Sequence, residues 1–203
     1  MADITAAGSV VTDWTAVAQN ALVESDITDI SDDLEAQLLL QAFLDTETAH
    51  TGTKLIVEIS HNTSGDEDWV ELQGAERVIL IGTANEELID DNPLTAGSTT
   101  ILMSSTTGFT VNGLLRGIKD GTIANSEIVR QIAETTNTDI DILDGTANEH
   151  ANTVNVYSIA MSAVIAYLPP SVRRVRVLVD NTYDPDGSTL VYRLMITRAT
   201  GIE

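Results

Sequence analysis

The segment KLIVEIS at residues 54–60 decides the fold class, because apolar side chains recur at every second position. In an extended strand Leu55 and Val57 would share one face, as a half-buried strand requires. A polar connection, NTSGD at residues 62–66, follows it and leads to a second apolar run, WVEL at residues 69–72. Two apolar runs around a glycine-containing turn predict a β-hairpin.

Similar short runs continue along the chain, separated by Gly, Asn, Asp and Thr. β-Branched side chains suit a pleated surface, and this spacing favours a small barrel or a sandwich. A second hairpin is predicted from the runs at residues 175–179 and 190–196, because PDG at residues 185–187 presets a turn. The pattern predicts further strands at residues 78–81, 100–103, 109–111, 128–132, 139–143 and 154–157.

Two segments near the start of the chain carry mixed signals. Residues 14–22 fit two turns of helix. Residues 32–44 begin with acidic side chains, as helices often do, but end in an apolar run that suits a buried strand. We favour a strand from Ala36 onward, so the predicted structure contains little helix.

The composition narrows the possible partners. The chain has 203 residues, of which 43% are apolar, and 31 acidic against 10 basic side chains give a net charge of −21. The apolar content predicts a packed core, whereas the charge argues against nucleic acid and against an anionic membrane as partners. The longest apolar stretch, residues 158–168, is shorter than the about 20 residues that a membrane helix needs. Residues 1–5 do not resemble a signal peptide, so we expect a soluble protein that is not secreted.

The charge is unevenly distributed along the sequence. Residues 1–150 hold 27 acidic and 5 basic side chains, whereas residues 151–203 hold 4 acidic side chains and 5 arginines. In a strand over residues 174–179 the valines would lie on one face and two arginines on the other. Such a face is either solvated, which we favour, or a contact for an acidic partner or subunit. The candidate contact residues are Arg173, Arg174, Arg176 and Arg193.

No catalytic motif is found. The sequence has no cysteine, no glycine-rich phosphate loop, no metalloprotease helix and no nucleophile elbow. We therefore predict no catalytic residues and no cofactor. The three histidines, His50, His61 and His150, are far apart beside turn residues, and we expect solvated loop side chains.

Metal binding has one weak signal. Asp180, Asp184 and Asp186 surround Gly187, and tight loops of carboxylates often hold calcium. A plain hairpin turn explains the same residues, and the acidic cluster at residues 26–35 is more easily read as a solvated stretch. We therefore predict no metal site.

Two stretches of the sequence resemble known proteins. The first, residues 98–157, contains SSTTGFTV at 104–111, IKDGTIANSEIVR at 118–130 and ANEHANTVNVY at 147–157. It resembles a small β-barrel module that is frequent in virion proteins of tailed bacteriophages. The second, VRRVRVLVDNT at 172–182 with YRLMITRA at 192–199, resembles the last strands of phage structural proteins that carry this module. Neither stretch contains catalytic residues that the resemblance would assign.

The outer parts of the chain are similar to jelly-roll sandwiches of the discoidin or carbohydrate-binding type. The similarity lies in the runs at 56–60 and 69–72 and in Pro169-Pro170 leading to 173–177. We therefore predict an all-β protein in which residues 1–75 and 158–203 form a jelly-roll-like β-sandwich with an N-terminal arm. Residues 76–157 are predicted to form an inserted small β-barrel domain.

The resemblance implies a bacteriophage virion structural protein. We predict a decoration or cement protein on the capsid exterior that bridges and stabilises capsid subunits, through the C-terminal arginines or an N-terminal arm at residues 4–22. The implied partners are the major capsid protein or other virion proteins, and a homo-oligomer is expected. The acidic part would face solvent and the C-terminal strands a partner. The alternatives are a neck, tail or baseplate protein, or a jelly-roll carbohydrate-binding module; an enzyme is not expected.

Overall fold

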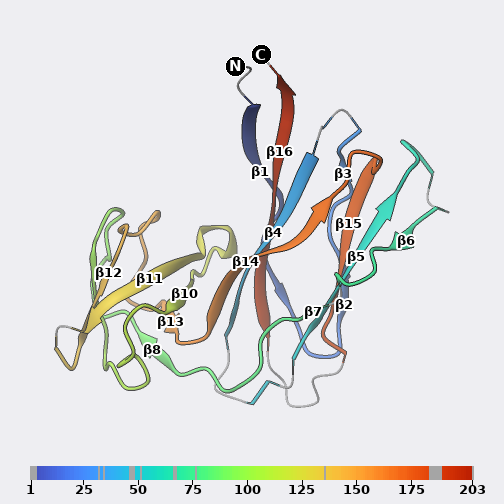
Figure 1. The fold of residues 1–203 in the computed structure, drawn as a ribbon. Coiled ribbons are helices and arrows are strands. Elements are labelled where there is room, and N and C mark those ends of the chain that lie inside the picture. The colour runs from blue at the N-terminus through green and yellow to red at the C-terminus, as the bar shows by residue number, and fades with distance from the viewer. Residues whose placement is uncertain are drawn as a thin grey trace.

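A computed structural model describes residues 4–31, 33, 35–45, 49–50, 52–65, 68–75, 77–134, 136–182 and 189–202. Over these residues the protein is all-β, with one short 3-10 helix, η1 (Ile123–Asn125). Figure 1 shows a sandwich and, beside it, a smaller body of strands. The sandwich strands are β1 (Ile4–Val17), β2 (Leu22–Glu24), β3 (Thr28–Asp29), β4 (Glu35–Leu44), β5 (Lys54–Ser60), β6 (Val70–Glu71), β7 (Arg77–Val78), β14 (Ala160–Leu168), β15 (Arg174–Asp180) and β16 (Leu190–Ile202). The smaller body contains β8 (Glu86–Leu88), β9 (Thr100–Leu102), β10 (Leu115–Lys119), β11 (Glu127–Glu134), β12 (Asp139–Ile142) and β13 (Asn155–Tyr157).

The sandwich has the strand order of a jelly roll. One sheet has the order β1-β16-β4-β14, and the other β2-β15-β5-β6 with β3 beside β15 and β7 beside β5. The pairs β1:β16, β2:β15, β4:β14 and β5:β6 are all antiparallel. The chain is thus a long ribbon of strand pairs, rolled up so that successive pairs lie in opposite sheets. This architecture is a double-sheet jelly roll, and the predicted hairpin of β5 and β6 is confirmed.

The core of the sandwich lies between the inner faces of the two sheets. Leu38, Leu40 and Ala42 of β4 are buried and share one face, as alternation along a strand requires. Val175 and Val177 of β15 face them from the other sheet and belong to the same apolar cluster. The expected strand from Ala36 onward and the expected valine face of residues 174–179 are therefore confirmed.

The smaller body is a curled antiparallel sheet with the order β8-β13-β10-β11-β12-β9. Its two edges meet, because a bridge joins Ile89, which follows β8, to Met103, which follows β9. The amide of Asp90 donates to the carbonyl of Leu102, and the amide of Ser104 donates to the carbonyl of Leu88, both at 2.9 Å. The sheet encloses an apolar cluster of its own, made of Ile89, Leu94, Ile101, Met103, Phe109, Ile118, Val129, Ile140, Ile142, Val154 and Val156.

The strands from β8 to β13 pair with one another, while β7 at residues 77–78 pairs with β5 of the sandwich. Gly82 also forms a bridge with His50. The start of the predicted insert, residue 76, therefore precedes a short strand that the sandwich uses. That the two parts fold independently stays a prediction.

The two parts contact each other through an aromatic cluster. Trp14 and Phe43 come from the outer face of the first sheet, and Tyr157 comes from β13. The ring centroid of Phe43 lies 5.6 Å from that of Trp14 and 5.9 Å from that of Tyr157. Gly117 of β10 lies directly against Phe43. An ion pair between Lys119 and Asp45 completes the contact.

Two expectations about the N-terminal part of the chain are wrong. Residues 14–22 do not form helical turns, because β1 continues through Val17. Residues 4–17 are also no free arm, since they pair with β16 from Ile4 opposite Ile202 to Val17 opposite Leu190. Long-range pairing and burial outweigh the weak local preference for helix.

The expected hairpin of residues 175–179 and 190–196 is also wrong. β15 pairs with β2, β3 and β5, whereas β16 pairs with β1 and β4 in the opposite sheet. The chain crosses between sheets at this point, and a turn motif has the same local sequence whether it joins paired or crossing strands. The motif at residues 185–187 lies outside the described residues.

The strand predictions inside the insert are largely correct. Strands are present at the expected runs near residues 100, 128, 139 and 154, but not at 109–111. There Phe109 is fully buried in the insert's core, and its carbonyl accepts a hydrogen bond from Gln131. Along the described chain the prediction omitted β1, β2, β3, β8, β10 and β14, and of the run expected at 78–81 only Val78 lies in a strand. No helix in the described part of the chain is long and apolar enough to span a membrane.

A Gly117→Ala substitution should destabilise the protein by about 1–3 kcal/mol, because overpacking forces neighbouring groups apart. A Cβ at this position would lie 2.2 Å from Cγ of Phe43. In a Phe43→Ala background the same change should cost little, because the ring is gone. Urea unfolding would measure both. Gly121→Ala is the control, because a Cβ there meets nothing within 4 Å; equal losses at both glycines would contradict the packing argument.

Removing residues 84–157 and joining the ends with a short Gly-Ser linker should leave a folded sandwich, because every sandwich pair remains. The deletion exposes Phe43, so some loss of stability is expected. Far-UV circular dichroism and thermal melting of the shortened protein test the prediction. The isolated segment 84–158 is measured in the same way. A sandwich fragment without cooperative unfolding would contradict the predicted domain division.

Candidate functional site

The C-terminal arginines that the sequence singled out make contacts within the fold, and of the four only Arg174 is buried. Arg174 and Arg176 project from the outward face of β15 and both contact the ring of Trp69, at 4.9 and 4.4 Å from its centroid. Arg174 is only 7% exposed. Its Nε donates to the carbonyl of Asn62 at 2.8 Å, and its Nη2 donates to that of Gly65 at 2.6 Å. Arg174 therefore holds the connection that follows β5.

Arg176 joins three strands of the second sheet. Its Nε donates to Glu58 of β5 at 2.6 Å, and its Nη1 donates to Glu24 of β2 at 2.8 Å. Burial lowers the pKa of Arg176, but hydrogen bonds to Glu58 and Glu24 outweigh it, and the net shift is upward. The guanidinium remains charged and neutralises carboxylates on the two flanking strands.

The other C-terminal arginines are also engaged within the molecule. Arg173 donates to the carbonyl of Ser31, and Arg193 lies 3.5 Å from a carboxylate oxygen of Asp13. The arginine-bearing strands β15 and β16 are central strands, flanked by acidic ones. The charge difference along the sequence is therefore not a difference between two sides of the molecule. A partner-contact role for these residues stays a prediction. In that role the arginines would keep their bonds within the molecule and contact the partner with their exposed atoms.

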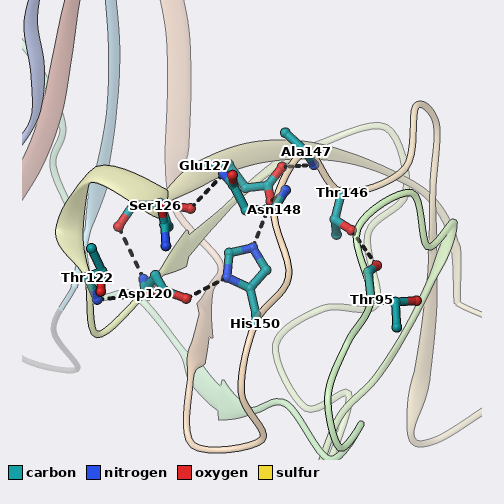
Figure 2. A network of polar contacts seen from close by, with 10 residues as sticks. Thr95, Asp120, Thr122, Ser126, Glu127, Thr146, Ala147, Asn148 and His150 are labelled. Atoms are coloured by element: carbon teal, nitrogen blue, oxygen red, sulfur yellow. Dashed lines mark hydrogen bonds and ion pairs between the residues drawn. The ribbon is translucent and has the colours of Figure 1, made fainter.

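The densest polar cluster lies in the insert, around His150. Its ring is fully buried, with Nδ1 2.8 Å from Oδ2 of Asp120 and Nε2 2.7 Å from Oε1 of Glu127. Figure 2 shows the imidazole between the two carboxylates. Ionised carboxylates only accept hydrogen bonds, so both ring nitrogens must donate, which describes the protonated imidazolium.

The charge state of His150 follows from these neighbours. Burial lowers the pKa of His150, but the hydrogen bonds and negative charges of Glu127 and Asp120 outweigh it and raise the pKa above its ordinary value. The two acids therefore favour the charged form of this buried ring. A protonated imidazole does not ligate a metal, because neither nitrogen has a free lone pair.

The cluster fastens three segments of the insert. Glu127 accepts hydrogen bonds from the amides of Ala147 and Asn148, at 2.8 and 3.2 Å. The backbone of His150 forms a bridge with Leu94. Asp120 accepts from the amide of Thr122 at 2.8 Å, which shapes the turn before η1. The role that these contacts support is to hold the loops at one end of the curled sheet.

The expectation that the histidines are solvated is wrong for two of them. His150 is fully buried and His50 is 2% exposed, 2.9 Å from the hydroxyl of Thr53. His61 is exposed, and its ring contacts the carbonyl of Ser171 at 2.9 Å. The sequence does carry a signal, since acidic residues lie 30 and 23 positions before His150. In a chain with 31 acids that spacing selects no pair.

Two of the three residues of the weak calcium signal, Asp184 and Asp186, lie outside the described residues. Asp180 accepts hydrogen bonds from the amide and hydroxyl of Thr182. Among the residues that the structure describes, no group of three or more acidic or histidine side chains is arranged to hold a metal ion.

The stability of the protein should fall as the pH rises through the pKa of His150. Because this pKa is raised in the folded state, its contribution is complete below the ordinary value of 6.5 and is lost above the folded-state value. Urea unfolding between pH 6 and 9 measures the effect, about 1.4 kcal/mol for each unit by which the pKa is raised. His150→Gln should flatten this dependence, whereas His61→Gln should not. A wild-type slope equal to that of His150→Gln would contradict the assignment.

No family model and no curated protein sequence matches the chain. Among solved structures, the chain is similar to VP17, a capsid protein of bacteriophage P23-77, with 9% identity and a TM-score of 0.20 over 100% of this chain and 99% of that one. It is also similar to a structure of infectious bursal disease virus, strain Gx, with 6% identity and a TM-score of 0.25 over 99% of this chain and 43% of that one. These TM-scores do not define a shared fold, and the jelly-roll assignment rests on the strand order of the sandwich.

Proposed function

We propose that this protein is a structural component of a bacteriophage virion that binds the outer surface of the capsid as a decoration or cement protein. The observation that carries the proposal is the strand order β1-β16-β4-β14 against β2-β15-β5-β6. Double-sheet jelly rolls of this kind form viral capsid and lectin domains. Because one fold hosts many functions, the surface chemistry has to distinguish between these roles.

The charge of both parts supports a position outside the shell. The predicted insert, residues 76–157, holds 12 acidic and 4 basic side chains, and the remainder holds 19 and 6. Both parts are therefore strongly acidic. Contact with packaged DNA would need cations to neutralise phosphates, and an acidic surface repels them.

The resemblance to phage virion proteins coincides with one structural unit. The stretch at residues 98–157 runs from β9 to β13, which is most of the curled sheet. A module of this kind attached to a jelly roll provides two separate surfaces on one chain. In the proposed mechanism the sandwich contacts one capsid subunit and the insert contacts its neighbour.

Such a protein would stabilise the shell by mass action. Binding to assembled subunits, and not to free ones, contributes about 2.7 kcal/mol per site at a concentration 100 times the Kd. Within this proposal Arg173 and Arg193 contribute contacts at the surface, since both side chains are partly exposed. Arg174 is buried beneath Trp69 and serves the internal structure.

Carbohydrate binding is the second role open to a jelly roll. A sugar platform needs a free aromatic face, and the ring of Trp69 is occupied by Arg174 and Arg176. The contacts of this ring argue against Trp69 as a sugar platform, whereas Tyr167 is 71% exposed, so the glycan array described below is needed to separate the two roles.

Purified protein should bind in a saturable manner to shells of its phage that were assembled without it, and should raise their melting temperature. Co-sedimentation and calorimetry measure both effects. Replacing Arg173 and Arg193 together by Ala should weaken binding. Arg198→Ala is the matched control, because Arg198 is as exposed as Arg193, lies near an Asp carboxylate in the same way and is not among the proposed contact residues. Absence of binding would overturn the proposal. Sedimentation with isolated tails or necks would support the neck or tail role, and binding on a glycan array would support the carbohydrate role.

A further inference from the structure

The strand β14 ends the first sheet of the sandwich and has an open edge. Its partner is β4, and no other described strand pairs with it. Its nine residues, AMSAVIAYL, include no charged side chain and no proline. An edge of this kind presents unpaired amides and carbonyls to any strand that approaches.

The edges of the second sheet are protected in ways that β14 is not, and β1 is protected in part. β1, at the opposite edge of the first sheet, carries Asp13 and has three register shifts against β16, although its segment Ala6–Val10 is regular and uncharged. In the second sheet, β2 is three residues long and carries Glu24, and β6 is two residues long and carries Glu71. Charge and shortness are the usual devices against strand pairing. β14 has a register shift against β4 only between Val164 and Ala166, so Ala160–Val164 remains a regular five-residue segment.

An apolar groove runs beside this edge. One cavity, of about 240 Å³, is lined by Met161, Ala163, Val164 and Ile165 of β14 and by Leu40 of the neighbouring strand β4. Across the open side of the sandwich it is lined by Leu55, Arg77, Val78 and Ile79. A second cavity, of about 280 Å³, continues past Tyr167. Tyr167 is 71% exposed and Val78 is 55% exposed. A strand added to the edge would cover both cavities and bury these side chains.

We propose that the protein forms a homodimer in which β14 pairs antiparallel with β14 of a second copy across a two-fold axis. The two four-stranded sheets would become one continuous sheet. A two-fold contact uses the same surface on both copies, so the surface must be self-complementary. β14 meets this condition, because its backbone offers donors and acceptors and its side chains are small or apolar. The inward side chains of the second β14 would lie over the groove, as in other cases of strand addition.

Charge directs self-association to this edge. Two copies that each carry −21 repel one another, so contact between them is least unfavourable where carboxylates are absent. None of the described residues that line the two cavities is acidic. Arg77 lies at both cavities and is exposed, so the charge of the described lining is positive in a chain whose net charge is −21. The inference is independent of the proposed capsid role, since it concerns the protein alone in solution.

Sedimentation velocity at 0.15 M salt should give twice the chain mass of 21.7 kDa at micromolar concentrations. Val164→Lys places like charges opposite each other near the axis and should raise the dimer Kd by about tenfold or more. Val10→Lys is the matched control, since Val10 is a similarly exposed valine, 43% against 36% for Val164, on the opposite edge strand of the same sheet. Circular dichroism shows that each variant is folded. A monomeric wild type at 100 μM, or equal weakening by both substitutions, would overturn the proposal.

Disulfide trapping distinguishes this geometry from other dimers, because the chain has no cysteine of its own. Single cysteines are introduced at Ala160, Ser162 and Val164, and the protein is oxidised. A two-fold antiparallel pair brings only the residue nearest the axis close to its own copy, so crosslinking should peak at one position. Uniform or absent crosslinking would contradict β14 pairing, as would a dimer that Val164→Lys leaves intact. Association only with an added capsid protein would assign the edge to that partner and overturn the homodimer.

Discussion

The pairing of β1 with β16 is the contact on which the rest of the sandwich depends. It joins the two ends of the chain, from Ile4 opposite Ile202 to Val17 opposite Leu190, and the termini lie side by side in Figure 1. The entropy of closing so long a loop grows only slowly with its length, so the ladder and the buried inner faces can offset it. The next pairs, β2:β15 and β4:β14, then continue the same ribbon inward.

This ribbon explains where the insert and the arginines lie. The insert leaves the chain between β7 and β14, where the path crosses from one sheet to the other, so it interrupts no strand pair. The last two strands of the chain become central strands because each pairs on both sides, β16 with β1 and β4, and β15 with β2 and β5. Arg176 is thereby placed between Glu24 and Glu58, which are distant in sequence and adjacent in the sheet.

The same order places β14 at an edge of the first sheet. β14 receives β4 on one side, and the crossing chain that follows it leads to the other sheet. The insert covers the aromatic residues Trp14 and Phe43 on the outer face of the first sheet, but the groove beside β14 remains open. Acidic side chains are plentiful elsewhere on the molecule, so an uncharged strand of this length sets this edge apart from the others.

The sequence by itself determined the all-β class, most individual strands and the inward face of β15, because alternation of apolar residues is a local property that burial on one face imposes. It also indicated an inserted barrel, through a resemblance that covers residues 98–157. It did not determine that β15 and β16 lie in opposite sheets, that residues 4–17 are a paired strand, or that His150 is buried between Asp120 and Glu127. These features depend on which distant segments meet. Tertiary structure alone decides this, because a strand, a turn or a lone histidine has the same local sequence whichever partner it finds.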